Sequence, residues 1–185
     1  NSGPDSPVYN TRSKEGFRWI SRGLWVRDGK LIALASLDES AGFFGPSLAL
    51  HAFQFNSETN VWDGLGVVYD NAINNFAPKK IPTGEWMMTR RTFDRHVSFL
   101  VGGTEAINQW ESFEAVSYSD SRLLAEEPYW WVLPDKNLLA LFRDNKRSGY
   151  LFRAFSTDNG RTWSDPVKTN FPDATSKFNG LQMSD

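Results

Sequence analysis

The segment Ser156-Thr157-Asp158-Asn159-Gly160-Arg161-Thr162-Trp163 carries the strongest fold signal in this sequence. Its serine, aspartate, glycine and tryptophan fit the pattern Ser-x-Asp-x-Gly-x-x-Trp. We expect Asp158 to accept hydrogen bonds from turn amides, because short carboxylates bond readily to backbone N–H groups close to them in sequence. Gly160 would supply a positive φ, and Trp163 would pack beneath the hairpin as the next strand begins. The segment therefore predicts a tight turn between two strands, with a structural role.

Related markers recur along the chain and indicate a repeat. Tryptophans open strand-like runs at Trp62, Trp110 and Trp163, roughly fifty residues apart. A strand–turn–strand pattern recurs in step with them at Leu24–Ser36 and Tyr129–Arg143, with Asp-Gly and Pro-Asp in the two turns. Such dipeptides between apolar runs are strong signals for β-hairpins.

A weaker copy of the hairpin is predicted at Trp86–Gly102, with its turn at Thr89–Asp94. Each repeat then holds four short strands, and four-stranded antiparallel units of this length are typical of β-propeller blades. We therefore predict an all-β propeller fold, present here as about three and a half blades of a longer chain. The predicted parts are an N-terminal extension at 1–16 and a partial propeller at 17–185, with blades near 18–70, 84–120 and 127–173 and a fourth beginning near 178.

Composition and charge exclude several classes of function. The net charge of −2 argues against nucleic acid or an anionic membrane as a partner. No apolar run approaches the ~18 residues of a membrane span, so we predict no membrane insertion. The absence of cysteine excludes disulfides and thiolate chemistry. No metal-ligand spacing or phosphate-binding loop is present, so no metal or cofactor is predicted. The basic cluster of Arg90, Arg91 and Arg95 is expected to be a solvated turn.

The Ser156–Trp163 segment resembles the Asp-box of the sialidase (neuraminidase)-like superfamily, also described as BNR-repeat β-propellers. The run from Glu127-Pro128 through Leu138–Arg143 to Tyr150–Ser156 is similar to a run common in these proteins. Phe17-Arg18-Trp19-Ile20 resembles the Tyr-Arg-Ile-Pro segment that opens their catalytic domain. The resemblance implies a six-bladed propeller when complete, and usually a glycoside hydrolase that acts on sialic acid or related acidic sugars. It also favours a secreted or periplasmic location, although the sequence leaves the location open.

The resemblance implies that arginines bind the carboxylate of an acidic sugar, because a planar guanidinium meets a carboxylate through two hydrogen bonds. Arg18 occupies the position of the first such arginine, and Arg22 is the alternative. Arg143 ends a predicted strand and would lie on the same rim. Glu127 begins a predicted inner strand, so its side chain would face the central channel or serve the fold.

Asp38 is the candidate general acid, on the loop Ser36–Pro46 beside Phe43 and Phe44. The tyrosine nucleophile implied by the resemblance would lie beyond Asp185. This chain carries Ser36-Leu37-Asp38 where sialidases have Glu-x-Arg, which favours an alternative, a non-catalytic glycan-binding propeller. A polysaccharide lyase with His51 or His96 as base is a second alternative. In each case the predicted partner is a glycan.

Overall fold

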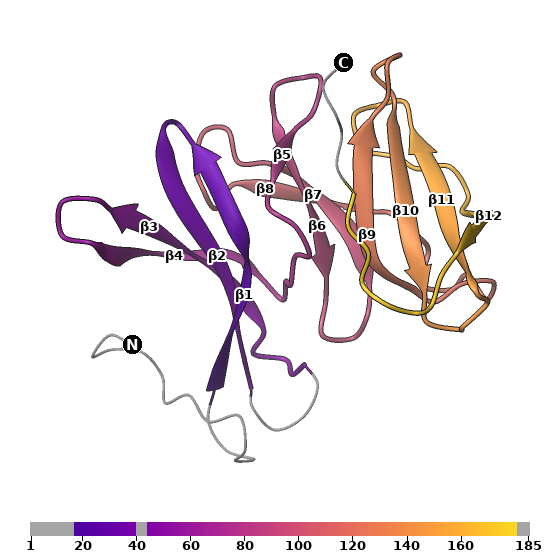
Figure 1. Cartoon of the computed structure of the whole chain (residues 1–185), viewed down its shortest axis with the longest axis horizontal. Helices are drawn as coiled ribbons and strands as arrows, with labels where there is room; N and C mark the ends of the chain where they lie inside the picture. Colours follow the sequence, from indigo (N-terminus) through magenta and orange to yellow (C-terminus); the bar gives the residue numbers. More distant parts are fainter. Residues whose placement is uncertain (1–16, 40–43, 181–185) are drawn as a thin grey trace. The chain divides into compact units, whose positions relative to one another are not determined.

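The computed structural model describes residues 17–39 and 44–180. Over these ranges the chain is all-β and forms three four-stranded antiparallel sheets, without a helix (Figure 1). The prediction of an all-β fold built from four-stranded antiparallel blades is confirmed. The chain divides into two compact units: the first runs to Ala77 and includes Thr92–Asp94, and the second comprises 78–91 and 95–185. No helix in the described part of the chain is long and apolar enough to span a membrane.

The first unit contains a sheet whose strands follow one another in chain order. Its strands are β1 (Phe17–Arg27), β2 (Lys30–Glu39), β3 (Ala49–Asn56) and β4 (Val61–Asp70). The β1–β2 hairpin turns at Asp28 and Gly29, and both residues have positive φ, the geometry of a tight two-residue hairpin turn. Along β2 every second side chain is buried, because successive strand residues point to opposite faces.

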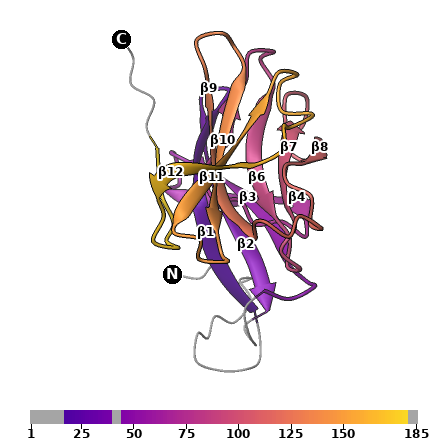
Figure 2. The same ribbon diagram turned by 90° about the vertical axis from the view of Figure 1, so that its right-hand side faces the viewer.

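The second unit contains the other two sheets, which Figure 2 shows from the side. One sheet is formed by β5 (Lys79–Lys80), β6 (Trp86–Arg91), β7 (Val97–Gly102) and β8 (Trp110–Glu114). The other is formed by β9 (Ala125–Val132), β10 (Leu138–Asp144), β11 (Tyr150–Ser156) and β12 (Val167–Pro172). Buried apolar side chains from both sheets make one core, which includes Met87, Phe99, Trp130, Leu138 and Phe142.

The turns β5–β6 and β9–β10 have the same hydrogen bonds. In the first, the Ile81 amide donates to the Glu85 carbonyl and the Gly84 amide donates to the Ile81 carbonyl. In the second turn, the Leu133 amide donates to the Asn137 carbonyl and the Lys136 amide donates to the Leu133 carbonyl. Lys136 has a positive φ there, as Gly84 has in the first turn. The second strand of each sheet begins directly after the turn. Its sixth residue is therefore Arg91 in β6 and Arg143 in β10.

The Ser156–Trp163 turn is held mainly by one carboxylate. Asp158 accepts hydrogen bonds from the Arg161 amide (3.1 Å), the Thr162 amide (2.8 Å) and the Thr162 hydroxyl (2.6 Å). Burial alone would raise the pKa of Asp158, but these bonds and one from Ser156 outweigh it and lower the pKa. The Trp163 ring packs on Phe99 with ring centres 4.6 Å apart. The turn thus joins its own strands to the core of the second unit.

Candidate functional site

Arginines and carboxylates gather at one end of each sheet. We call this the proximal end: the end at which the first strand of a sheet begins and its second strand ends. In the first sheet Arg18 of β1 lies opposite Asp38 of β2. In the third sheet Glu126 of β9 lies opposite Arg143 of β10, and Arg91 ends β6 of the second sheet. The Ser156–Trp163 turn lies at the other end of the third sheet, because Ser156 pairs with Leu138 at the start of β10.

Arg18 and Asp38 form an ion pair. The Arg18 Nη2 lies 3.0 Å from the Asp38 Oδ2, and Asp38 is fully buried while Arg18 remains partly exposed. The other carboxylate oxygen accepts a hydrogen bond of 2.9 Å from the Gly45 amide. The Arg18 guanidinium also lies 5.9 Å from the ring centre of Phe44, whereas Phe43 lies outside the described residues. Asp38 therefore ties the segment after β2 back to β1, and both described contacts use it as an acceptor.

Arg22 lies four residues after Arg18, where β1 is irregular. It is the extra residue of a β-bulge between Ser21 and Gly23 of β1, where the register with β2 shifts. Gly23 has a φ of 124°, in the region that favours glycine. Its Cβ, if present, would lie 3.3 Å from the Ala77 amide nitrogen, so a side chain would be crowded there. A bulge of this kind turns the side chains of its strand locally.

Arg91 is the residue that the sequence analysis missed. The prediction of a solvated turn at this position is wrong, because β6 continues through Arg91 and the side chain is buried. Its guanidinium makes three hydrogen bonds to Glu126, at 2.8, 2.9 and 3.1 Å. The signal that was available is the repeat itself: Arg91 stands at the same distance from its turn as Arg143 does.

Arg143, the repeat equivalent of Arg91, is bound less completely. Its Nη1 lies 2.9 Å from the Glu127 Oε2 and donates to the Thr175 carbonyl at 3.3 Å. Its Nε is buried and has no hydrogen-bond partner among the described residues. The side chain is 16% exposed, against 4% for Arg91. The Arg143 side chain is thus partly accessible, whereas Arg91 is enclosed.

A bulge in β9 directs Glu126 and Glu127 to different arginines. Two residues of β9 oppose the single residue Phe142 of β10, and Glu127 has a φ of 45°. A residue other than glycine with positive φ, placed directly before Pro128, is in an unfavourable conformation. Such strain persists only where surrounding contacts hold it. Here the contact is the ion pair with Arg143.

Next to Arg143 the surface carries an open polar hollow of about 620 Å³, lined by Asn145, Arg147, Ala174 and Thr175. Asp144 fixes the turn that presents this lining, because its carboxylate accepts hydrogen bonds from the amides of Leu124, Lys146 and Ser148. Burial alone would raise the pKa of Asp144, but a hydrogen bond from the Ser148 side chain and these amide bonds outweigh it and lower the pKa. The hollow therefore has a rigid, charged wall.

The two histidines lie in different settings. His51 packs edge-on against Trp19, with ring centres 5.0 Å apart. Burial lowers the pKa of His51, and the charge of Asp70 only partly opposes this. His96 stacks on Tyr118 with ring centres 4.2 Å apart. No group of three or more metal-ligating side chains is found in the parts of the chain that the structure covers, 17–39 and 44–180.

The fold is that of the sialidase-like β-propellers, as the sequence analysis predicted from the resemblance. Residues 53–185 match the family model described as a BNR repeat-like domain. The chain belongs to this family. No curated protein matches the sequence.

Solved structures support the same fold at low identity. A protein of unknown function from Dyadobacter fermentans superposes with a TM-score of 0.63 at 14% identity, over 85% of this chain and 52% of that one. The leech intramolecular trans-sialidase complexed with 2,7-anhydro-Neu5Ac gives a TM-score of 0.51 at 22% identity, over 68% and 20%. The Ruminococcus gnavus intramolecular trans-sialidase in complex with oseltamivir carboxylate gives 0.50 at 19%, over 83% and 35%. The chain spans about half the length of the first structure and less of the others.

Proposed function

We propose that this chain belongs to a carbohydrate-active propeller, a glycoside hydrolase resembling exo-sialidases, and that Arg143 binds the acid group of its sugar. The observation that carries the proposal is the difference between the two equivalent arginines. Glu126 occupies Arg91 with three hydrogen bonds, whereas Arg143 has one carboxylate contact and one carbonyl contact.

A partly exposed guanidinium with remaining donors attracts a carboxylate, because charge-assisted bonds to arginine are short and directional. The polar hollow beside Arg143 supports this, since Asn145 can bond hydroxyl groups and Arg147 adds a second positive charge. The leech intramolecular trans-sialidase, which has a similar fold, is complexed with an acidic sugar, 2,7-anhydro-Neu5Ac. An acidic sugar with free hydroxyl groups fits this set of side chains.

In the first unit, Asp38 is the proposed general acid, and Arg18 is a proposed contact to an acid group. As a proton donor Asp38 would have to leave its contacts with Arg18 and Gly45, because both now use it as an acceptor. The complete burial of Asp38 specifically favours a second candidate function, a glycan-binding propeller without catalysis.

Binding of the full-length protein to a glycan array of acidic and neutral sugars tests whether Arg143 binds an acidic sugar. We expect Arg143→Gln to weaken binding of acidic sugars about tenfold or more, by loss of a charge-assisted bond. The matched control is Arg153→Gln, because Arg153 lies on β11 and its guanidinium packs on Phe155. An unchanged preference for acidic sugars in Arg143→Gln would sink the proposal for Arg143.

Hydrolysis of the glycans that bind separates the two candidate functions. If Asp38 is the general acid, Asp38→Asn should lower turnover by about a hundredfold or more while binding persists. Thermal unfolding of the variant is the control, because the change also weakens a partly buried ion pair. Binding without turnover in the wild-type protein would establish the non-catalytic alternative.

A further inference from the structure

Tyr118 is an exposed aromatic side chain that the fold holds in a defined position. It lies in the segment between β8 and β9, in a turn closed by the Asp120 amide bonding to the Ser117 carbonyl at 2.9 Å. The Tyr118 amide donates to the Glu114 carboxylate at 3.3 Å. The side chain is 60% exposed, so it contributes little to the core.

The Tyr118 ring has one covered face and one open face. The covered face lies against His96, with ring centres 4.2 Å apart and planes inclined by 32°. The cavity bordered by both residues is only about 20 Å³, room for a single water molecule. The ring is thus supported from behind and presented to solvent in front.

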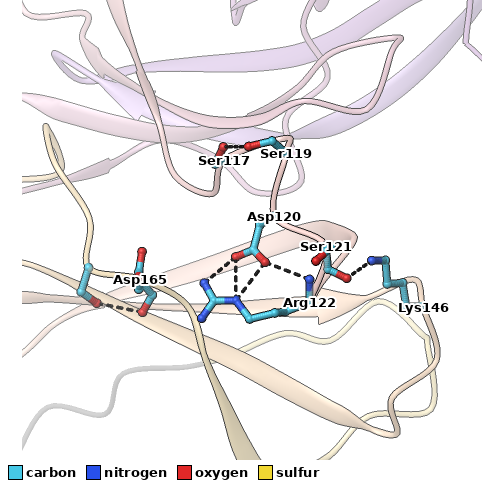
Figure 3. Close-up of polar contacts among 8 residues, drawn as sticks. Ser117, Ser119, Asp120, Ser121, Arg122, Lys146 and Asp165 are labelled. Atoms are coloured by element: carbon cyan, nitrogen blue, oxygen red, sulfur yellow. Dashed lines mark hydrogen bonds and ion pairs between the residues drawn. The ribbon is translucent and has the colours of Figure 1, made fainter.

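Polar groups surround this turn. Arg122 is bound to Asp120 through three side-chain hydrogen bonds of 2.7 to 3.2 Å, as Figure 3 shows. Hydrogen bonding from the Arg122 side chain is the main cause that lowers the pKa of Asp120. The hydroxyls of Ser117 and Ser119 lie 2.9 Å apart. The exposed aromatic face of Tyr118 is suited to a pyranose ring, which has an apolar C–H face and a rim of hydroxyls.

The Tyr118 segment is connected to the wall of the polar hollow. The Lys146 ammonium donates to the Ser121 carbonyl (Figure 3). The Asn145 amide donates to the Leu124 carbonyl at 2.9 Å. Asn145 itself lines the hollow, so the segment that follows Tyr118 is hydrogen-bonded to the wall of the hollow.

We infer that Tyr118 is a stacking platform for a pyranose ring, so that the ligand is an oligosaccharide and not a single sugar. The open face of Tyr118 packs against the C–H face of a sugar, whose hydroxyl rim stays free to bond the neighbouring loop or solvent. The assignment of the acidic sugar to Arg143 rests on the proposed function, whereas stacking on Tyr118 needs no charge on the sugar.

The test is an array of acidic and neutral oligosaccharides probed with the full-length protein and its variants. We expect Tyr118→Ala to lose about tenfold or more in binding of oligosaccharides, and Tyr118→Phe to keep it, because the ring is retained. Phe171→Ala is the matched control, since Phe171 is equally exposed at 61% and lies on β12. Melting temperatures of all three variants should stay close to the wild type.

The outcomes distinguish this inference from the proposed function. If neutral oligosaccharides bind through Tyr118 and Arg143→Gln has no effect, the platform stands and the acidic-sugar proposal fails. If acidic sugars bind through Arg143, and Tyr118→Ala binds oligosaccharides with the same affinity as the wild-type protein, the stacking role of Tyr118 is refuted. The absence of binding to every oligosaccharide on the array overturns both.

Discussion

At the scale of single residues, Lys79 has an unusual environment. Its ammonium donates to the Trp130 carbonyl at 3.0 Å and lies 4.2 Å from the ring centre of Tyr129. Burial lowers its pKa from 10.5 to about 8. Cation–π contacts and one carbonyl therefore replace only part of the water that the ammonium loses.

Lys79 should make stability depend on pH. Between about pH 8 and the ordinary lysine value near 10.4, the unfolded chain keeps a proton that the folded chain has released. The free energy of unfolding should therefore rise with pH through this window, and Lys79→Met should remove that part of the slope. Urea unfolding at a series of pH values up to about 9.5 measures it, below the range in which Tyr129 titrates. Lys80→Met is the control, and an unchanged slope in Lys79→Met would contradict the prediction.

The Arg91–Glu126 pair gives a second prediction at this scale. Both side chains are buried, so Glu126→Gln leaves a guanidinium without its counter-charge. We expect a loss of about 3–5 kcal/mol in the free energy of unfolding. Glu105→Gln, at an exposed carboxylate, should change it by no more than about 0.5 kcal/mol. Equal effects of the two substitutions in urea unfolding would argue against a buried pair.

At the scale of elements, two glycines in turns of the second unit share a φ of 87° but differ in their surroundings. A Cβ on Gly160 would lie 2.5 Å from the Met87 sulfur, whereas a Cβ on Gly84 meets nothing within 4 Å. Gly84→Ala should therefore cost only the backbone strain, about 1 kcal/mol. Gly160→Ala should cost about 1–3 kcal/mol more, because Met87 must move within the core.

Thermal unfolding of the two glycine variants side by side measures this difference. A smaller cost for Gly160→Ala than for Gly84→Ala would show that the Ser156–Trp163 turn is not packed against Met87. The comparison emphasises packing, since both glycines have the same φ.

At the scale of the whole molecule, the sheets are the parts that could be predicted from the sequence. The Asp28-Gly29 turn and the Ser156–Trp163 turn are formed by residues close together in the chain, so their sequences carry the signal. The predicted turn at Thr89–Asp94 failed for the opposite reason. Its polar residues suggest a loop, but pairing with β7 keeps β6 extended through Arg91.

The candidate site was only partly predictable. Arg18, Asp38, Arg143 and Glu127 were named from the sequence, and the structure pairs them two by two. The sequence analysis did not predict that Asp38 is enclosed, that Tyr118 is exposed, or that Arg91 binds Glu126. Each of these features depends on a contact with a residue at least seven positions away in the chain: Asp38 with Gly45, Tyr118 with His96, and Arg91 with Glu126.

By itself, therefore, the sequence determined the repeat, the four-stranded sheets and their tight turns, because these rest on local hydrogen bonding and on the alternation of apolar residues. The tertiary structure alone decided which of the two equivalent arginines is fully bound by a carboxylate and which remains partly exposed. Glu126 holds Arg91 with three hydrogen bonds, while Arg143 has one contact with Glu127 and one with the carbonyl of Thr175. The physical reason is that burial and charge pairing are set by neighbours across sheets, and local sequence does not encode those neighbours.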